Sequence, residues 1–178
     1  MSGQVVYSLE GTQAFSINGN SGVVTTNQQF DREQGSGRYS VTGTASDRGN
    51  PSLSAKVTIT VAIVDQNDQP PVFAERTYTA NVAEDAAIGT SITDLSASDG
   101  DIGDNARLDY FVSSGDTAHN FRMETVYGGS NYGILELAGK LDYETKKSYT
   151  IKVTATDRKN SDTVDVVITV SNKSATKK

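Results

Sequence analysis

The 178-residue sequence contains no cysteine, no tryptophan and a single histidine, His119. The absence of cysteine excludes disulfide frameworks, thiol catalysis and cysteine-based zinc sites. It does not exclude an extracellular protein, because a domain with an adequate hydrophobic core needs no disulfide. His119 stands beside Asn120 in a polar stretch, so we interpret it as an exposed loop residue.

Basic clusters and long apolar runs are missing as well. The net charge is −6 and the pI is about 4.7, whereas proteins that bind the phosphate backbone carry basic clusters. The pairs Lys146-Lys147 and Arg158-Lys159 are typical of solvated turns. We therefore expect no nucleic-acid partner. No apolar run approaches the ~20 residues of a membrane span, so none is predicted within this sequence.

The sequence shows no set of residues that would make a catalytic site. Asp99 and Asp101 could imitate the acid pair of a glycosidase, but they stand close together in one loop. No nucleophile, general base or cofactor motif accompanies them, so we predict that the chain is not an enzyme.

Alternation of apolar and polar residues is the main structural signal. It occurs in the segments 39–45, 149–155 and 164–170, and a period of two predicts β-strands with one buried face. Clusters of Gly, Asn, Asp and Ser interrupt it at short intervals, which is typical of a β-sandwich. No segment has a helical apolar stripe, so we expect an all-β fold.

The same patterns occur twice, about 110 residues apart, and a period of that length is too long for a solenoid unit. It indicates two domains in tandem. The matching segments are 30–33 with 141–144, 39–48 with 149–158, and 57–61 with 166–170.

The first copy is predicted to lack its first two strands and the acidic loop after them. Residues 6–8 align with 109–111, and the second copy has further predicted strands before this point. A sandwich without two strands exposes its core and an unpaired strand edge. An unusual fold, a partner chain or partial disorder would each compensate for this loss.

Residues 65–71 read Asp-Gln-Asn-Asp-Gln-Pro-Pro, which suits neither a buried strand nor a helix. Proline removes a backbone donor and fixes φ, and the residue before it is pushed to an extended form. We therefore predict a stiff, oxygen-rich linker at 65–71. It ends a partial repeat at 1–70 and is followed by a second repeat at 71–171 and a tail at 172–178.

Acidic and amide residues gather where the expected strands end. Crowded carboxylates repel one another and must take up protons or a cation. Oxygen ligands without His or Cys select Ca²⁺ or Mg²⁺, and many flexible carboxylates favour Ca²⁺. An EF-hand that begins at Asp99 is excluded, because its sixth position is Asp104 instead of Gly and its twelfth is Tyr110 instead of Glu.

In their order and spacing, these motifs resemble tandem extracellular repeats of the cadherin superfamily over nearly the whole chain. The resemblance implies an all-β fold of cadherin-type Greek-key, immunoglobulin-like β-sandwich repeats, joined by a short Ca²⁺-binding linker. The matching segments are 31–33, 45–54, 65–73, 82–90, 97–106, 141–144 and 155–157.

The resemblance also implies up to three Ca²⁺ ions between successive repeats. Side chains from the first repeat, the linker and the second repeat would bind them, together with the backbone carbonyls of Gln66, Gln69 and Asn105. The side-chain ligands would be Asp31, Glu33, Asp65, Asn67, Asp68, Asp99, Asp101 and Asp157.

Glu84, Asp142 and Glu144 would form an incomplete distal half-site, since no downstream linker completes it. The family also uses a Glu from the first strand of the upstream repeat, and Glu84 is its counterpart in the second repeat. The first repeat begins after that strand. We therefore expect the outermost ion to be weak or absent, and Asp47 to be a surface acid.

The resemblance implies an extracellular module of a larger, membrane-anchored ectodomain that is rigidified by calcium and supports homophilic cell adhesion. The partner would be another cadherin, homophilic or heterophilic. Without a tryptophan to dock into a partner, the chain is interpreted as an internal segment instead of an adhesive tip. A calcium-dependent, cadherin-like binding module for carbohydrate or another surface ligand is the alternative. Its aromatic candidates would be Tyr110, Phe111, Tyr127 and Tyr132, of which at least two suit core packing better.

Overall fold

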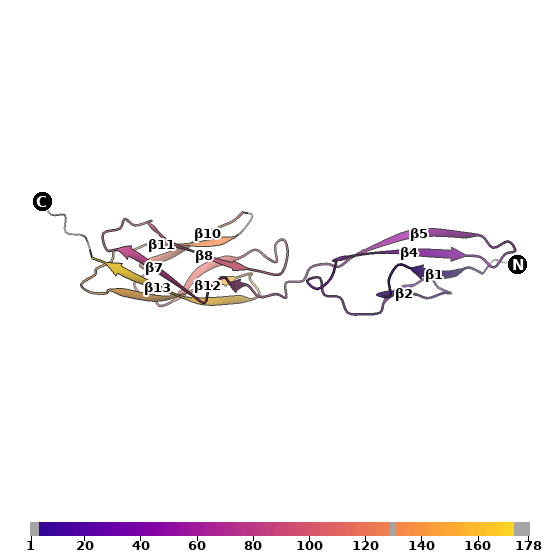
Figure 1. The fold of residues 1–178 in the computed structure, drawn as a ribbon, viewed down its shortest axis with the longest axis horizontal. Helices are drawn as coiled ribbons and strands as arrows, with labels where there is room; N and C mark the ends of the chain where they lie inside the picture. The colour runs from indigo at the N-terminus through magenta and orange to yellow at the C-terminus, as the bar shows by residue number, and fades with distance from the viewer. Residues whose placement is uncertain (1–3, 129–130, 173–178) are drawn as a thin grey trace. The chain divides into compact units, whose positions relative to one another are not determined.

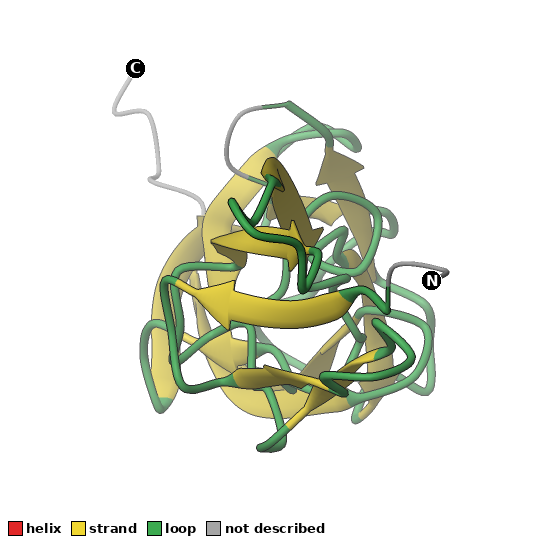
Figure 2. Ribbon diagram, turned by 90° about the vertical axis from the view of Figure 1, so that its right-hand side faces the viewer, coloured by secondary structure: helices red, strands yellow, loops and turns green. Residues whose placement is uncertain are grey.

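The computed structural model describes residues 4–128 and 131–172, and within these ranges all regular structure is β-strand (Figure 2). This confirms the predicted all-β fold. The described part of the chain therefore contains no helix that could cross a membrane. The chain forms two compact units, unit 1 (Met1–Asp65) and unit 2 (Gln66–Lys178). The predicted tail lies, beyond Asn172, outside the described residues.

Unit 2 is a sandwich of two four-stranded sheets (Figure 1). One sheet has the strand order β10-β11-β8-β6 and the other has the order β7-β13-β12-β9. All neighbouring strands are antiparallel except β7 and β13, which run parallel. The strands are β6 (Val72–Phe73), β7 (Thr77–Ala83), β8 (Ser91–Ser98), β9 (Asp109–Ser114), β10 (Phe121–Val126), β11 (Tyr132–Leu137), β12 (Ser148–Thr156) and β13 (Ser161–Ser171).

The core of unit 2 follows directly from the alternation in its strands. On β12 and β13, Ile151 pairs with Val166 and Tyr149 with Ile168, and all four side chains are buried. Leu95 on β8 is also fully buried and belongs to the same apolar cluster. Each sheet thus covers the apolar face of the other, as two-layer packing requires.

Two of the aromatic residues considered as sugar-stacking candidates lie on the surface of unit 2. Phe111 is 47% exposed and Tyr127 is 49% exposed. Tyr110 is buried in the core and accepts a hydrogen bond from the Ala97 N–H at its phenolic oxygen. Tyr132 is partly buried on β11.

Unit 1 has a three-stranded sheet with the order β1-β4-β5 and a separate hairpin of β2 and β3. Its small core has three buried residues, Ala14, Phe15 and Val41. Phe15 packs against Phe30 and Tyr39 with ring centroids 5.3 and 5.5 Å away. The strands are β1 (Val6–Glu10), β2 (Phe15–Ile17), β3 (Val24–Thr26), β4 (Arg38–Ser46) and β5 (Ser54–Ala62).

The strands of unit 1 correspond in order to β9 through β13 of unit 2. The β4–β5 ladder pairs Val41 with Ile59, just as the β12–β13 ladder pairs Ile151 with Val166. By this register, residues 57–61 correspond to 164–168, so the expected match of 57–61 with 166–170 is wrong by two residues. Within the described residues, unit 1 has no counterpart of β6, β7 or β8.

The Ile168→Ala substitution tests how much the two-layer packing stabilises unit 2. Ile168 is fully buried, so truncation removes apolar contacts and leaves a cavity, and we expect the free energy of unfolding to fall by about 2–5 kcal/mol. Val57 on β5 is 60% exposed, so Val57→Ala should change stability by less than about 0.5 kcal/mol. Urea denaturation followed by circular dichroism measures both. Equal losses of stability in the two variants would contradict this assignment of the core.

Candidate metal centre

The linker residue Asn67 is held on unit 2 by the turn that joins β12 to β13. Its side-chain amide donates to the Asp157 carbonyl at 3.4 Å, and its Oδ1 accepts from the Asn160 amide at 2.9 Å. The Lys159 ammonium donates to the Asn67 carbonyl. These contacts fix the course of the linker against unit 2.

Three acidic side chains converge beside this linker. Asp99 and Asp101 lie in the loop after β8, and Asp157 directly follows β12. One carboxylate oxygen from each lies within 4.8 Å of the others. Asp101 is 5% exposed and Asp157 is 3% exposed, which is uncommon for ionisable side chains that lack a countercharge.

Local turn geometry directs these carboxylates. The Asp99 Oδ1 accepts from the Asp101 N–H at 2.9 Å, and the Asp157 Oδ1 accepts from the Lys159 N–H at 2.7 Å. Such side-chain bonds to a backbone N–H two residues on are the Asx-turns that Asp favours. The two turns therefore place the acids at the same end of the sandwich.

The surroundings stabilise the ionised form of Asp157. Burial acts to raise the pKa of Asp157, but hydrogen bonds from Asn160, Lys159 and Asn67 outweigh burial and lower it. Asn160 contributes through both its backbone N–H and its side-chain amide. Hydrogen bonds from neutral donors thus favour the ionised form of Asp157.

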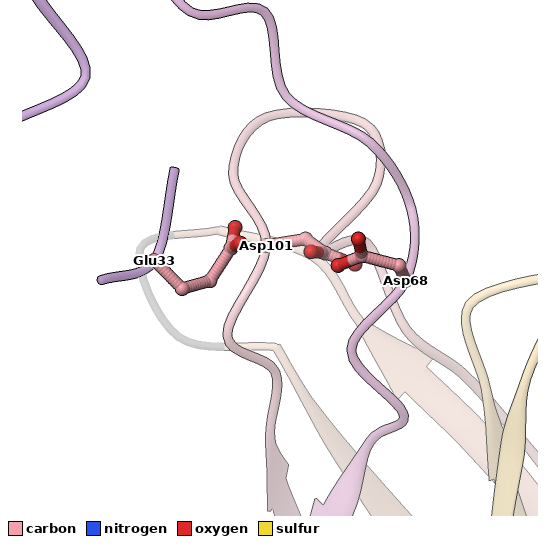
Figure 3. A group of neighbouring side chains, drawn as sticks. All are labelled: Glu33, Asp68 and Asp101. Carbon is pink, nitrogen blue, oxygen red and sulfur yellow. The ribbon is translucent and has the colours of Figure 1, made fainter. Parts of the chain in front are cut away.

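Asp68 from the linker extends this group of acids. Figure 3 shows the carboxylates of Asp68 and Asp101 directed toward each other. One oxygen of each lies within 4.8 Å of the other. The Gln69 N–H donates to the Asp101 Oδ2 at 3.3 Å, and the Gln69 amide donates to the Asp68 Oδ1 at 3.2 Å. Three carboxylates, those of Asp68, Asp99 and Asp157, therefore lie near Asp101 on unit 2.

This group fits a hard divalent cation. All the acidic donors are oxygens, and the chain offers no cysteine near them. The Asp101 Oδ1 is buried and has no hydrogen-bond partner among the described residues. A buried carboxylate oxygen in that position costs free energy unless it is coordinated or protonated. These residues could hold a metal ion.

In unit 1, two of the predicted ligands bind an arginine. Arg32 forms ion pairs with both Glu33 and Asp65. The Asp31 Oδ1 accepts from the N–H groups of Glu33 and Gln34 at 3.0 and 3.2 Å. Sequence reasoning assigned no role to Arg32, although its position between two expected ligands was a signal.

A second group of acids lies at the other end of β12. Glu84 follows β7, while Asp142 and Glu144 precede β12, and their oxygens also lie within 4.8 Å of one another. Hydrogen bonds from the Thr145 side chain and backbone hold the pKa of Asp142 below its usual value. The structure thus brings together the three residues of the predicted distal half-site.

The remaining predicted ligands are backbone carbonyls. Gln66 is exposed in the linker, and Asn105 is partly buried in the loop after β8. Their role in metal binding stays a prediction. Sequence reasoning missed Asn160, which binds both Asp157 and Asn67. The signal was an amide residue just after an expected ligand in a turn.

Comparisons with known proteins agree with one another. A family model described as "Cadherin domain" matches residues 1–64 and 78–171. Cadherin-8 of Homo sapiens is 42% identical over 158 residues, which are 86% of this chain and 20% of that protein. Cadherin EGF LAG seven-pass G-type receptor 2 of Mus musculus is 36% identical over 167 residues, which are 92% of this chain and 6% of that protein.

Solved structures of cadherin-23 and desmocollin-1 are similar to this chain as well. The crystal structure of mouse cadherin-23 EC22-24 has a TM-score of 0.79 at 28% identity, covering 94% of this chain and 54% of that one. The human desmocollin-1 ectodomain has a TM-score of 0.82 at 25% identity, covering 96% of this chain and 35% of that one. The chain thus spans only a small part of the curated relatives named above.

The Asp157→Ala substitution tests the hydrogen bonds at the acid group without a metal. It removes the acceptor of three donors on Lys159 and Asn160, so we expect the free energy of unfolding in EDTA at pH 7 to fall by about 1–3 kcal/mol. The control is Asp165→Ala, because Asp165 forms an exposed ion pair with Lys152 and should contribute less than about 1 kcal/mol.

The same pair of variants gives a pH test. The pKa of Asp157 is lower in the folded state than in the unfolded state. The stability that ionised Asp157 contributes is therefore fully present above its unfolded-state pKa of about 3.9, and it is lost as the pH falls through its folded-state pKa. The difference in the free energy of unfolding between the unsubstituted chain and the Asp157→Ala variant should therefore become smaller at acidic pH. A difference that stays constant from pH 7 to pH 2.5 would contradict an ionised Asp157.

Proposed function

Because the chain belongs to the cadherin family, we propose that it is a Ca²⁺-binding pair of extracellular repeats whose junction is rigidified by calcium. The observation that carries this proposal is the group of Asp99, Asp101 and Asp157 beside the linker, with two of the three acids almost fully buried. Like charges at that spacing repel strongly where water is excluded. A divalent cation is the simplest way to keep all of them ionised at neutral pH.

The ligands on unit 2 and the linker would be Asp68, Asp99, Asp101, Asp157 and Asn67, with the carbonyls of Gln66, Gln69 and Asn105 as further oxygens. Bound Ca²⁺ would supply positive charge and bonds to several oxygens at once. Asp101 is central among these residues, because its carboxylate is near Asp68 on one side and near Asp99 and Asp157 on the other.

The proposed mechanical effect depends on the path of the chain. Asp65, the last residue of unit 1, is followed immediately by the linker residues that bind unit 2. We propose that Asp31, Glu33 and Asp65 complete the calcium sites from unit 1. When calcium is removed, the crowded carboxylates repel one another and the junction becomes flexible, since only the linker then connects the two units.

At the level of the whole protein, we propose a role in calcium-dependent, homophilic or heterophilic adhesion of an ectodomain on the cell surface. The two curated relatives named above carry the word cadherin in their names, and the chain spans 20% or less of each. The chain would act by binding and stiffness, without an enzymatic step. Glu84, Asp142 and Glu144 would begin the next calcium site and bind weakly by themselves.

Calcium removal tests the proposal directly. A ligand at a hundredfold excess over its dissociation constant stabilises the folded state by about 2.7 kcal/mol, so we expect the midpoint of thermal unfolding to be higher in millimolar Ca²⁺ than in EDTA by on the order of 10 °C. Scanning calorimetry of the full chain measures this shift. Coincident melting curves would show that the residues bind no calcium.

The Asp101→Asn variant locates the site. It keeps the size of the side chain but removes the charge next to three other acids, so we expect most of the calcium-dependent stabilisation to be lost. The Asp68→Asn variant should have a similar effect. Asp94→Asn on the exposed side of β8 is the matched control and should keep the full shift. Calorimetric titration with Ca²⁺ should likewise give weaker binding for Asp101→Asn and Asp68→Asn than for Asp94→Asn.

A further inference from the structure

Arg32 binds two of the acids that are proposed above as calcium ligands. Its Nε donates to the Asp65 carboxylate, and its Nη2 forms an ion pair with Glu33. All three residues belong to unit 1. The Arg32 side chain is 16% exposed and that of Asp65 is 11% exposed, so water screens this ion pair less than an exposed one.

The turn that carries Arg32 does not need an arginine. The same turn occurs in both units, and in each the Oδ1 of the first Asp accepts from the backbone N–H groups two and three residues on, at 3.0 and 3.2 Å. The second residue is Arg32 in the turn 31–34 and Tyr143 in the turn 142–145. Because the backbone bonds are the same with a tyrosine, the role of Arg32 lies in its side chain.

The guanidinium of Arg32 suits a place between two carboxylates. It keeps its positive charge at every physiological pH, and its planar set of donors can bond to more than one carboxylate at once. Two carboxylates that share one guanidinium lie close enough to repel each other, and the positive charge offsets that repulsion. Arg32 therefore stabilises Glu33 and Asp65 side by side without any metal.

The same two carboxylates are proposed calcium ligands, so a metal and the guanidinium compete for them. Arg32 bonds to the Oδ1 of Asp65 and to the Oε1 of Glu33. The guanidinium would repel a divalent cation bound to the same carboxylates, because like charges at short range repel even near a protein surface. Arg32 cannot be a ligand itself, since it has no acceptor atom.

From the two ion pairs, and from the equivalent turn that forms without an arginine, we infer that Arg32 sets the calcium affinity of unit 1. It takes the place of a cation on Glu33 and Asp65, which stabilises the metal-free chain and weakens the binding of Ca²⁺. This inference rests on the proposed calcium-binding function. Arg32 is thus an affinity-determining residue, and the junction responds to calcium at a higher concentration than the same acids would without it.

The Arg32→Gln variant of the full chain tests the inference. We expect the Ca²⁺ concentration at half-saturation in calorimetric titration to fall at least about fivefold, because the repulsion is removed. In EDTA, we expect the midpoint of thermal unfolding to fall by on the order of 4 °C, because Glu33 and Asp65 lose their countercharge. Tighter calcium binding together with lower metal-free stability is not the result of a damaged fold, which would weaken both.

Two further variants separate charge at this place from other effects. Arg32→Lys keeps the positive charge and should leave the half-saturation concentration within about threefold of that of the unsubstituted chain. Arg48 is exposed and follows the other end of β4, so Arg48→Gln removes the same net charge away from the proposed ligands. It should change the half-saturation concentration less than about twofold, since exposed charges at a distance are screened.

Two results would overturn the role of Arg32. One is a folded Arg32→Gln variant that binds calcium with unchanged or lower affinity, because Arg32 would then support the ligands instead of competing for them. The other is an equal gain in affinity in Arg48→Gln, which would reduce the effect to net charge. Both presuppose that the chain binds calcium. The absence of calcium binding in every variant would instead contradict the proposed function, so the two failures can be told apart.

Discussion

A sheet with one apolar face is stable only when a second layer covers that face, and this constraint governs both units. In unit 2, the sheets meet through Ile151, Val166 and Leu95, which are fully buried. In unit 1, the same kind of ladder joins β4 and β5, but the strands equivalent to β6, β7 and β8 are not among the described residues. The result is one closed sandwich and one with an open face.

The sandwich also explains how acids that are distant in sequence meet. Asp99 and Asp101 follow β8, and Asp157 follows β12, so the strands carry them to one end of unit 2. The linker runs past the same end because Asn67 bonds to Asn160 and to the Asp157 carbonyl. The fold thus gathers these carboxylates at one end of unit 2, with Asp101 and Asp157 almost fully buried.

Much of the fold was predictable because alternation and burial have the same cause. The segments 149–155 and 164–170 alternate, and their apolar residues are the ones that the core buries. At least two of the four aromatic candidates for sugar stacking were expected to pack in the core. Tyr110 is buried there, whereas Tyr132 is only partly buried.

The strand pattern, the repeat and the residue types of the acid groups depend on local spacing and on side-chain chemistry, so they could be predicted from the amino-acid sequence. The partners of these residues depend on the folded chain. In it, Arg32 bonds to Glu33 and Asp65, Asn160 holds Asp157, and an Asp101 oxygen is buried without a hydrogen-bond partner among the described residues. It also decided that Val57 is exposed while Val164 is buried. Their local sequences are similar, and the difference comes from strands that pack against one of them and not against the other.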